Sequence, residues 1–138
     1  MRVFLAAAIA ATQAVSAQVQ GQPASSPPAN ESGTQFYARY LATVQKATTV
    51  AEVVAFWSAD LAKQFNDAPP AYRTDLDGMK RIYSVVTSVE VVKETPTSMG
   101  ATLSLQGVNR DKNKVSGTVD LFKENGVWRV AGLEGWKN

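Results

Sequence analysis

The sequence of 138 residues contains no cysteine and no histidine. Without cysteine no disulfide can hold the fold together, and a lipid anchor attached to a cysteine is excluded. Without either residue, zinc and most transition-metal sites are disfavoured, and a His–Asp dyad for proton transfer near neutral pH is excluded. The sequence therefore predicts a domain stabilised by packing, with no metal site and no cofactor.

The sequence also has no large excess of positive or negative charge. The 14 basic side chains are balanced by 12 acidic ones, which leaves a formal net charge of +2. Basic residues gather at Arg110, Lys112 and Lys114, with Asp111 between them, and this pattern is typical of a solvated turn. The charge pattern therefore gives no basis for nucleic-acid binding.

The apolar run near the N-terminus is too short to span a membrane. It covers residues 3–14 after Arg2, and at about 1.5 Å per helical residue it falls short of a hydrocarbon core of about 30 Å. Small residues at Val15-Ser16-Ala17 complete the pattern of a secretory signal. We expect residues 1–17 to be a signal peptide that is cleaved before Gln18. The mature protein is then exported, to the bacterial periplasm or the extracellular space, without a membrane anchor.

The remaining chain divides into a linker and one domain. Residues 18–33 are rich in proline and serine and are expected to be a disordered linker. In residues 34–138 apolar side chains recur every three or four positions up to about Thr87, and every second position after it. This pattern predicts an α+β fold in which N-terminal helices pack on a bent, four-stranded antiparallel meander sheet, as in a cone-like or cystatin-like domain.

Local signals place the expected elements. The first helix carries the apolar stripe of residues 36–44, the second opens at a capping box of Thr49 and Glu52, the third at Ser58, and the fourth covers about 71–86. The expected strands are 88–95, 101–108, 114–124 and 127–136.

The dipeptide Asn125-Gly126 is the most specific local signal in the chain. Both residues accept the positive φ angles of a type I′ turn, which joins two antiparallel strands. A turn at this point places Leu121 opposite Val130, and Val119 opposite Gly132, on one face of the sheet. We expect that face to be the core side.

Two segments carry a resemblance to a known superfamily. They are the helix start Thr49-Val50-Ala51-Glu52 with the following residues 56–61, and the closing segment 117–130. Together with helices ahead of a bent sheet, they make residues 34–136 resemble the nuclear-transport-factor-2-like superfamily, in particular its small exported bacterial branch. The resemblance implies an α+β cone, which enzymes of the superfamily line with Asp, His, Tyr or Arg side chains. No catalytic residue of those enzymes matches a position in this chain, so none is assigned.

Five aromatic side chains fall on the expected inner faces. They are Tyr37, Tyr40, Trp57, Tyr83 and Trp128. Such residues fill a core, or they line an apolar cavity if the cone stays partly open. We therefore favour a non-catalytic exported module that binds a small apolar ligand or a cell-envelope partner, with these five residues lining the pocket. A homodimer formed through the open face of the sheet is a further hypothesis.

The alternative is an enzyme, namely a small-molecule lyase, isomerase or hydrolase with its site in the cone cavity. Tyr72, Asp75, Arg81 and Tyr83 are the candidates for a base, a cation and hydrogen-bond donors at the mouth of the cone. An Asp or Tyr in the cavity with a strongly shifted pKa would favour this hypothesis.

A calcium loop is suggested by Asp75-Leu76-Asp77-Gly78, because alternating carboxylates precede a glycine in EF-hands. The register does not fit. With Gly78 at the sixth position, the first and twelfth ligands would be Arg73 and Ser84, where the loop needs carboxylates. The motif is therefore not interpreted as a metal site.

Overall fold

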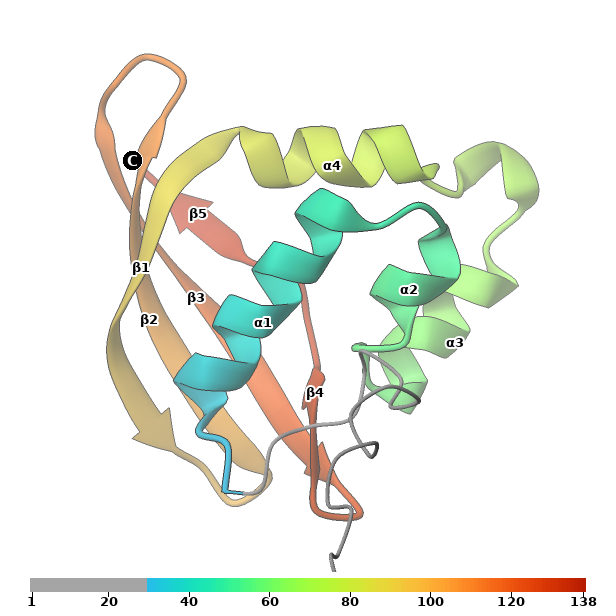
Figure 1. The fold of residues 1–138 in the computed structure, drawn as a ribbon, viewed down its shortest axis with the longest axis horizontal. Coiled ribbons are helices and arrows are strands. Elements are labelled where there is room, and N and C mark those ends of the chain that lie inside the picture. Colours follow the sequence, from blue (N-terminus) through green and yellow to red (C-terminus); the bar gives the residue numbers. More distant parts are fainter. Residues whose placement is uncertain (1–29) are drawn as a thin grey trace, which may run out of the picture.

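The computed structural model describes residues 30–138, so the expected signal peptide and most of the expected linker lie outside the described residues. The described chain is an α+β domain in which helices cover the concave face of a curved antiparallel sheet, as the sequence predicts (Figure 1). The helices are α1 (Gly33–Lys46), α2 (Val50–Val54), α3 (Ala59–Asp67), the short 3-10 helix η1 (Pro70–Tyr72) and α4 (Leu76–Ser84). The strands are β1 (Val86–Pro96), β2 (Gly100–Asn109), β3 (Lys114–Glu124), β4 (Val127–Val130) and β5 (Gly135–Lys137).

Each α-helix begins after a residue whose side chain accepts a hydrogen bond from a free backbone N–H of the first turn. These residues are Ser32, Thr49, Ser58 and Asp75. Thr49 forms the expected capping box with Glu52, and Ser32 forms a second one with Gln35. Because Ser32 caps α1, the helix begins at Gly33, inside the segment that was expected to be linker.

Helix α4 is shorter than the sequence predicts. It begins at Leu76, not near Ala71, because the Asp75 carboxylate accepts a hydrogen bond from the backbone N–H of Gly78 at 2.7 Å. The preceding residues form η1, which starts at Pro70. Asp75 is thus a helix cap, and this role accounts for the motif that resembles a calcium loop.

The fourth predicted strand is divided in two. The sheet runs in the order β1-β2-β3-β4, and β5 pairs with β3 beyond the end of β4. Asn125 and Gly126 have φ angles of 52° and 77°, and Leu121 pairs with Val130 as predicted. The predicted continuation of this pairing to Gly132 does not form, because the chain leaves the ladder after Val130 and rejoins β3 only at Gly135.

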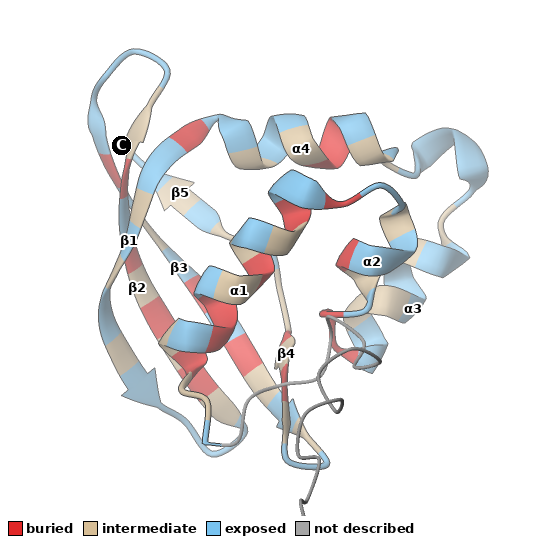
Figure 2. Ribbon diagram, in the orientation of Figure 1, coloured by how far each residue is buried: buried red, intermediate tan, exposed pale blue. Residues whose placement is uncertain are grey.

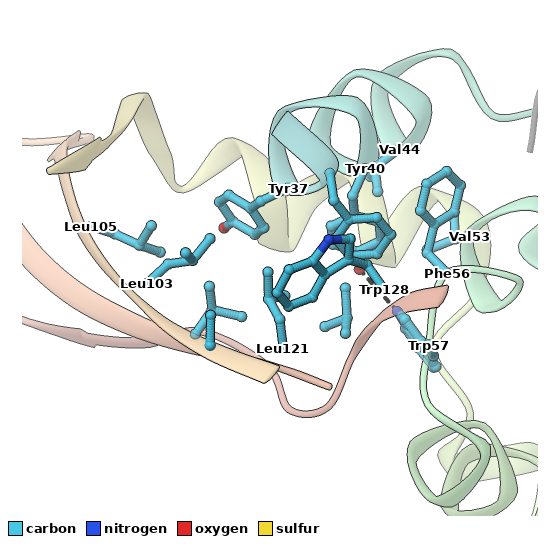
Figure 3. Close-up of a cluster of buried hydrophobic side chains, with 14 of the residues drawn as sticks. Tyr37, Tyr40, Val44, Val53, Phe56, Trp57, Leu103, Leu105, Leu121 and Trp128 are labelled. Atoms are coloured by element: carbon cyan, nitrogen blue, oxygen red, sulfur yellow. Dashed lines mark hydrogen bonds between the residues drawn. The ribbon is translucent and has the colours of Figure 1, made fainter. Parts of the chain in front are cut away.

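The core lies between α1 and the concave face of β2, β3 and β4 (Figure 2). Leu121 and Val130 are fully buried, so the inner face of the sheet is the one that the Asn-Gly turn predicts. Aromatic rings fill the centre of the core, where the ring centroids of Tyr40 and Phe56 lie 5.5 Å apart (Figure 3). Packing therefore holds the fold, as expected for a chain without disulfides.

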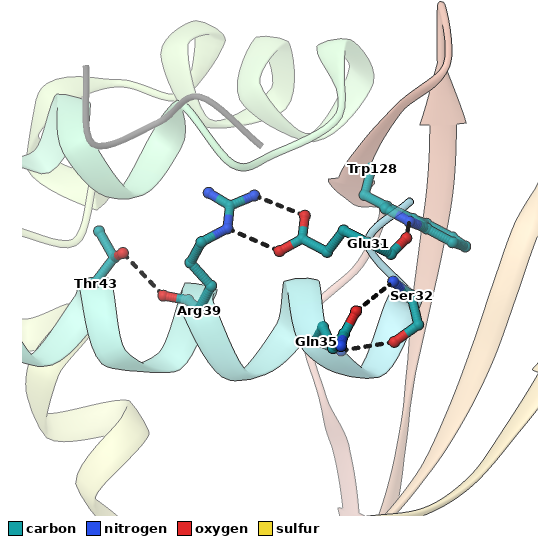
Figure 4. A network of polar contacts seen from close by, with 6 residues as sticks. All are labelled: Glu31, Ser32, Gln35, Arg39, Thr43 and Trp128. Carbon is teal, nitrogen blue, oxygen red and sulfur yellow. Dashed lines mark hydrogen bonds and ion pairs between the residues drawn. The ribbon is translucent and has the colours of Figure 1, made fainter. Parts of the chain in front are cut away.

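Glu31, which precedes α1, is bound to the domain by an ion pair and a hydrogen bond (Figure 4). The guanidinium of Arg39 donates through Nε and Nη2 to the two carboxylate oxygens of Glu31 at 2.9 and 3.0 Å. Trp128 Nε1 donates to the backbone carbonyl of Glu31 at 2.8 Å, and Arg39 also lies over the ring of Phe56. The Glu31 side chain is only 4% exposed. Glu31 therefore belongs to the folded domain, although the sequence places it in the linker.

Candidate functional site

A pocket of about 580 Å³ opens between α1, the C-terminal end of α4, the start of β1 and the segment that joins β4 to β5. Its volume lies within the range of roughly 300–1,000 Å³ that is typical of small-molecule sites. Two of its apolar lining residues, Ile82 and Leu133, are 53% and 54% exposed. Apolar surface thus continues from the pocket to the outside of the molecule.

The break between β4 and β5 places a carboxylate in this pocket. Ala131 makes the last hydrogen bond of the interrupted strand, from its N–H to the carbonyl of Asp120 at 2.9 Å. The chain then leaves the sheet through Gly132 and returns to it at Gly135. Between these glycines, Leu133 and Glu134 both line the pocket. In a continuous strand through 127–136, the side chains of these two residues would point to opposite faces of the sheet.

Glu134 is held by a phenol from α1. The hydroxyl of Tyr37 donates to Glu134 Oε1 at 2.7 Å. Burial raises the pKa of Glu134 above its usual value, whereas the hydrogen bond from Tyr37 and the nearby hydroxyl of Tyr83 act in the opposite direction. Burial also raises the pKa of Tyr37 and of Tyr83, so both phenols stay protonated and act as donors. The result is one carboxyl group with two phenol hydroxyls beside it.

A series of hydrogen bonds between aromatic side chains lies behind the pocket wall. Trp57 Nε1 donates to the hydroxyl oxygen of Tyr40 at 2.9 Å (Figure 3). That oxygen lies 2.5 Å from the hydroxyl oxygen of Tyr83. Burial raises the pKa of Tyr40 to about 12. The hydroxyls of Tyr40 and Tyr83 share this hydrogen bond, in which either oxygen can be the donor. Tyr83 thus connects the buried Tyr40 to the pocket, where its hydroxyl lowers the pKa of Glu134.

The indole of Trp136 forms another part of the pocket wall, and a glycine makes room for it. Gly117 on β3 pairs with Trp136 on β5, and a Cβ atom at Gly117 would come within 2.8 Å of the indole. Real side chains do not tolerate such a contact, so the glycine lets the ring lie against the sheet. The pocket therefore has three aromatic side chains in its lining, namely Tyr37, Tyr83 and Trp136.

The pocket lining contains an acidic residue but no basic one. Glu134 is the only formally charged residue among those that line it, and no lysine or arginine lines it. The other polar lining residues are neutral, such as Gln45 and Thr87. The pocket therefore offers one acidic hydrogen-bonding group, phenol hydroxyls and aromatic side chains, but no basic partner for an anion.

The five aromatic residues expected to line a pocket take different places. Tyr37 and Tyr83 line it. Tyr40 lies behind Tyr83, and Trp57 is in the core with its N–H bonded to Tyr40. Trp128 lies at the other end of the sheet, beside Glu31. Sequence reasoning did not identify Glu134 or Trp136 as site residues, although the glycines on either side of Glu134 indicate a break in the strand.

The residues proposed for an enzymatic site do not come together. Asp75 caps α4, Tyr72 is 82% exposed, and neither these two nor Arg81 lines the pocket. Tyr83 alone of that set does. In residues 30–138 there is no group of three or more acidic side chains placed to hold a metal ion. Within the same range, no helix has the length and apolar character needed to cross a membrane.

The open face of the sheet, which was proposed for a homodimer, is polar where β2 and β3 pair. Thr102 and Asp120 face each other there, and the Thr102 hydroxyl donates to the Asp120 carboxylate at 2.7 Å. Ser104 pairs with Thr118 on the same face. This part of the surface therefore offers few apolar groups to a second subunit.

The fold and the pocket define an α+β domain with a small-molecule-sized cavity that carries one carboxyl group. Comparison with protein-family models, with curated proteins and with solved structures finds no match for this chain.

Proposed function

We propose that this domain is a binding module for a small, mainly apolar molecule, which it holds in the pocket between α1, α4, β1 and β5. The observation that carries the proposal is the cavity of about 580 Å³, which is lined by aliphatic and aromatic side chains and has half-exposed Ile82 and Leu133 in its lining. Burying such surface in a ligand complex is favourable by about 25 cal/mol per Å². A concave pocket of this size fits a small molecule better than a flat protein surface, so an apolar ligand is preferred over an envelope protein.

Titration with the neutral, environment-sensitive dye N-phenylnaphthylamine tests this proposal. The dye fluoresces when it enters an apolar site, so we expect saturable binding to the wild type. Ala42 lines the pocket and is exposed on α1, so Ala42→Trp should obstruct the pocket and weaken dye binding at least about tenfold. Ala51→Trp is the matched control on α2, because Ala51 is exposed and does not line the pocket. Equal dye binding by both variants would refute the assignment of the pocket.

An enzyme is the second candidate, and Glu134 is the observation that favours it. A carboxyl group whose pKa is raised by burial, with Tyr37 and Tyr83 as donors beside it, can transfer a proton to or from a bound molecule. A small-molecule lyase, isomerase or hydrolase in this cavity would use Glu134 as the acid or base and Tyr83 as a hydrogen-bond donor. The residues differ from those that the sequence suggests for such a site.

Mass spectrometry of a metabolite extract distinguishes the two candidates. An enzyme depletes one compound and produces another, and Glu134→Gln abolishes the conversion because an amide cannot exchange the proton. A binding module retains a compound without converting it. Retention without turnover by the wild type would therefore exclude the enzymatic candidate for that compound.

We further propose that the protein is exported and that its domain belongs to the nuclear-transport-factor-2-like superfamily. Export is supported by Arg2, the apolar residues 3–14 and the small residues 15–17. The superfamily is supported by the arrangement of helices ahead of a curved antiparallel sheet with a pocket. The N-terminus of the protein isolated from the periplasm or the medium tests export, because we expect it to be Gln18. A mature protein that retains Arg2 would contradict the proposal.

A further inference from the structure

We infer that the molecule bound in the pocket carries a positively charged amino group, which Glu134 holds while the apolar body of the ligand fills the cavity. This inference rests on the proposed binding function and specifies the chemical class of the ligand. It follows from the charge, the donors and the aromatic rings around Glu134.

Charge complementarity is the first argument. Glu134 is the only formally charged residue in the lining, so no basic side chain of the pocket neutralises it. A carboxylate that is partly removed from water is stabilised by a cation close to it. A ligand with a carboxylate or phosphate group would meet the opposite situation, since the pocket lining has no lysine or arginine to receive it. The pocket therefore selects cations over anions.

The hydrogen bonds prepare Glu134 for such a partner. A carboxylate has about four lone-pair sites, and the hydroxyl of Tyr37 occupies one of them at Oε1. The hydroxyl of Tyr83, which shares a hydrogen bond with Tyr40, also lies close enough to Glu134 to lower its pKa. Both phenols lower the pKa of Glu134, as hydrogen-bond donors to a carboxylate do. The remaining lone pairs can accept from the N–H groups of an ammonium ion.

Aromatic faces supply the second favourable surface. Tyr83 and Trp136 are half-buried and line the pocket together with Glu134, whereas Tyr37 is only 1% exposed and acts there through its hydroxyl. An alkylammonium ion is attracted to the face of an aromatic ring within about 6 Å, most strongly to tryptophan. The ring of Trp136 lies against the sheet over Gly117 and forms part of the pocket wall. One carboxylate among aromatic rings is the arrangement that suits an organic cation.

Three ligands with the same apolar chain test the inference, namely octylamine, octanol and octanoate. Binding is measured by calorimetry and by the intrinsic tryptophan fluorescence, to which Trp136 in the pocket wall contributes. We expect octylamine to bind at least about tenfold more tightly than octanol, the ratio that a charge-assisted hydrogen bond of about 1.4 kcal/mol gives, and octanoate to bind most weakly. Glu134→Gln should remove the preference for octylamine over octanol. Glu90→Gln is the control, because Glu90 is exposed and does not line the pocket.

The outcomes separate this inference from the proposed function. If octylamine is preferred, and Glu134→Gln but not Glu90→Gln abolishes the preference, the inference is supported. If octanol binds as tightly as octylamine, or if the preference survives in Glu134→Gln, the inference is overturned while the pocket remains a binding site. If none of the three ligands binds to the wild type at millimolar concentration, both the inference and the proposed function fail. Circular dichroism of each variant verifies that the domain is folded.

Discussion

Replacing Tyr40 with phenylalanine removes one oxygen atom from the series of hydrogen bonds behind the pocket. The Tyr40 hydroxyl accepts from Trp57 Nε1 at 2.9 Å and lies 2.5 Å from the hydroxyl of Tyr83. A phenylalanine ring keeps the contacts with Phe56 and Tyr83, whose ring centroids lie 5.5 and 5.6 Å away, so the substitution leaves no cavity of the size of a side chain. The effect is therefore one of hydrogen bonding and not of packing.

The two hydrogen-bond partners of the Tyr40 hydroxyl differ in whether water can replace it. The Trp57 side chain is in the core at 8% exposure, so its N–H group is left without an acceptor, which costs about 1–3 kcal/mol. Tyr83 lines the pocket, where water can replace Tyr40 as its partner, so its contribution is small. We expect Tyr40→Phe to lower the free energy of unfolding by about 1–3 kcal/mol. For a domain near 100 residues, this corresponds to a decrease in Tm of roughly 5–20 °C.

Urea unfolding followed by far-ultraviolet circular dichroism measures this effect, because the signal does not depend on the tryptophan environment. A double-mutant cycle with Trp57→Phe isolates the hydrogen bond. Once the indole N–H is absent, Tyr40→Phe should cost at least about 1 kcal/mol less than it does in the wild type. A loss below about 0.5 kcal/mol in the wild type, or an equal loss in both backgrounds, would refute the reasoning.

Three further predictions concern the site, the N-terminal contact and the core. Burial raises the pKa of Glu134 in the folded state, so its contribution to stability is complete in acid and is lost as pH rises through the folded pKa. Glu134→Gln should therefore be more stable than the wild type at pH 7 but not at about pH 3. Thermal melts of both proteins at the two pH values measure this difference. Arg39→Gln should cost about 3 kcal/mol in urea unfolding, since it leaves the buried Glu31 carboxylate unpaired, and a loss below about 1 kcal/mol would contradict this. Leu121→Ala should cost about 2–5 kcal/mol in the core, whereas Leu133→Ala should change stability by less than about 0.5 kcal/mol but weaken ligand binding in calorimetry.

The parts of the fold that depend on local chemistry were predictable from the sequence. The capping box at Thr49 and the positive φ angles at Asn125-Gly126 involve residues close together in the chain, so the residue types alone indicate them. The turn then determines that Leu121 faces Val130, and from this pairing the core side of the sheet follows. Helix α4 shows the limit of periodicity, because apolar spacing continues upstream of Asp75 while the cap ends the helix there.

The candidate site was predictable only in part. Tyr37 and Tyr83 were named because helical periodicity places them on inner faces, and both line the pocket. Glu134 was missed because residues 127–136 alternate well enough to be interpreted as one strand, and an acidic residue near the end of a strand is ordinarily exposed. The division of that strand depends on the pairing of β5 with β3, which is a contact between segments distant in sequence. Gly132 and Gly135 were the available signal.

The stability effect expected for Glu134 and its proposed role in binding have the same physical origin. Burial opposes ionisation of Glu134, so at neutral pH the empty domain is less stable than a domain with a neutral amide at that position. A bound cation reverses this effect, because it stabilises the ionised form in the folded state only. Ligand binding then adds stability as RT ln(1 + [L]/Kd), and the wild type should gain more from an amine than Glu134→Gln does. We therefore expect Glu134 to destabilise the empty fold and to stabilise the occupied one, a combination that packing alone would not favour.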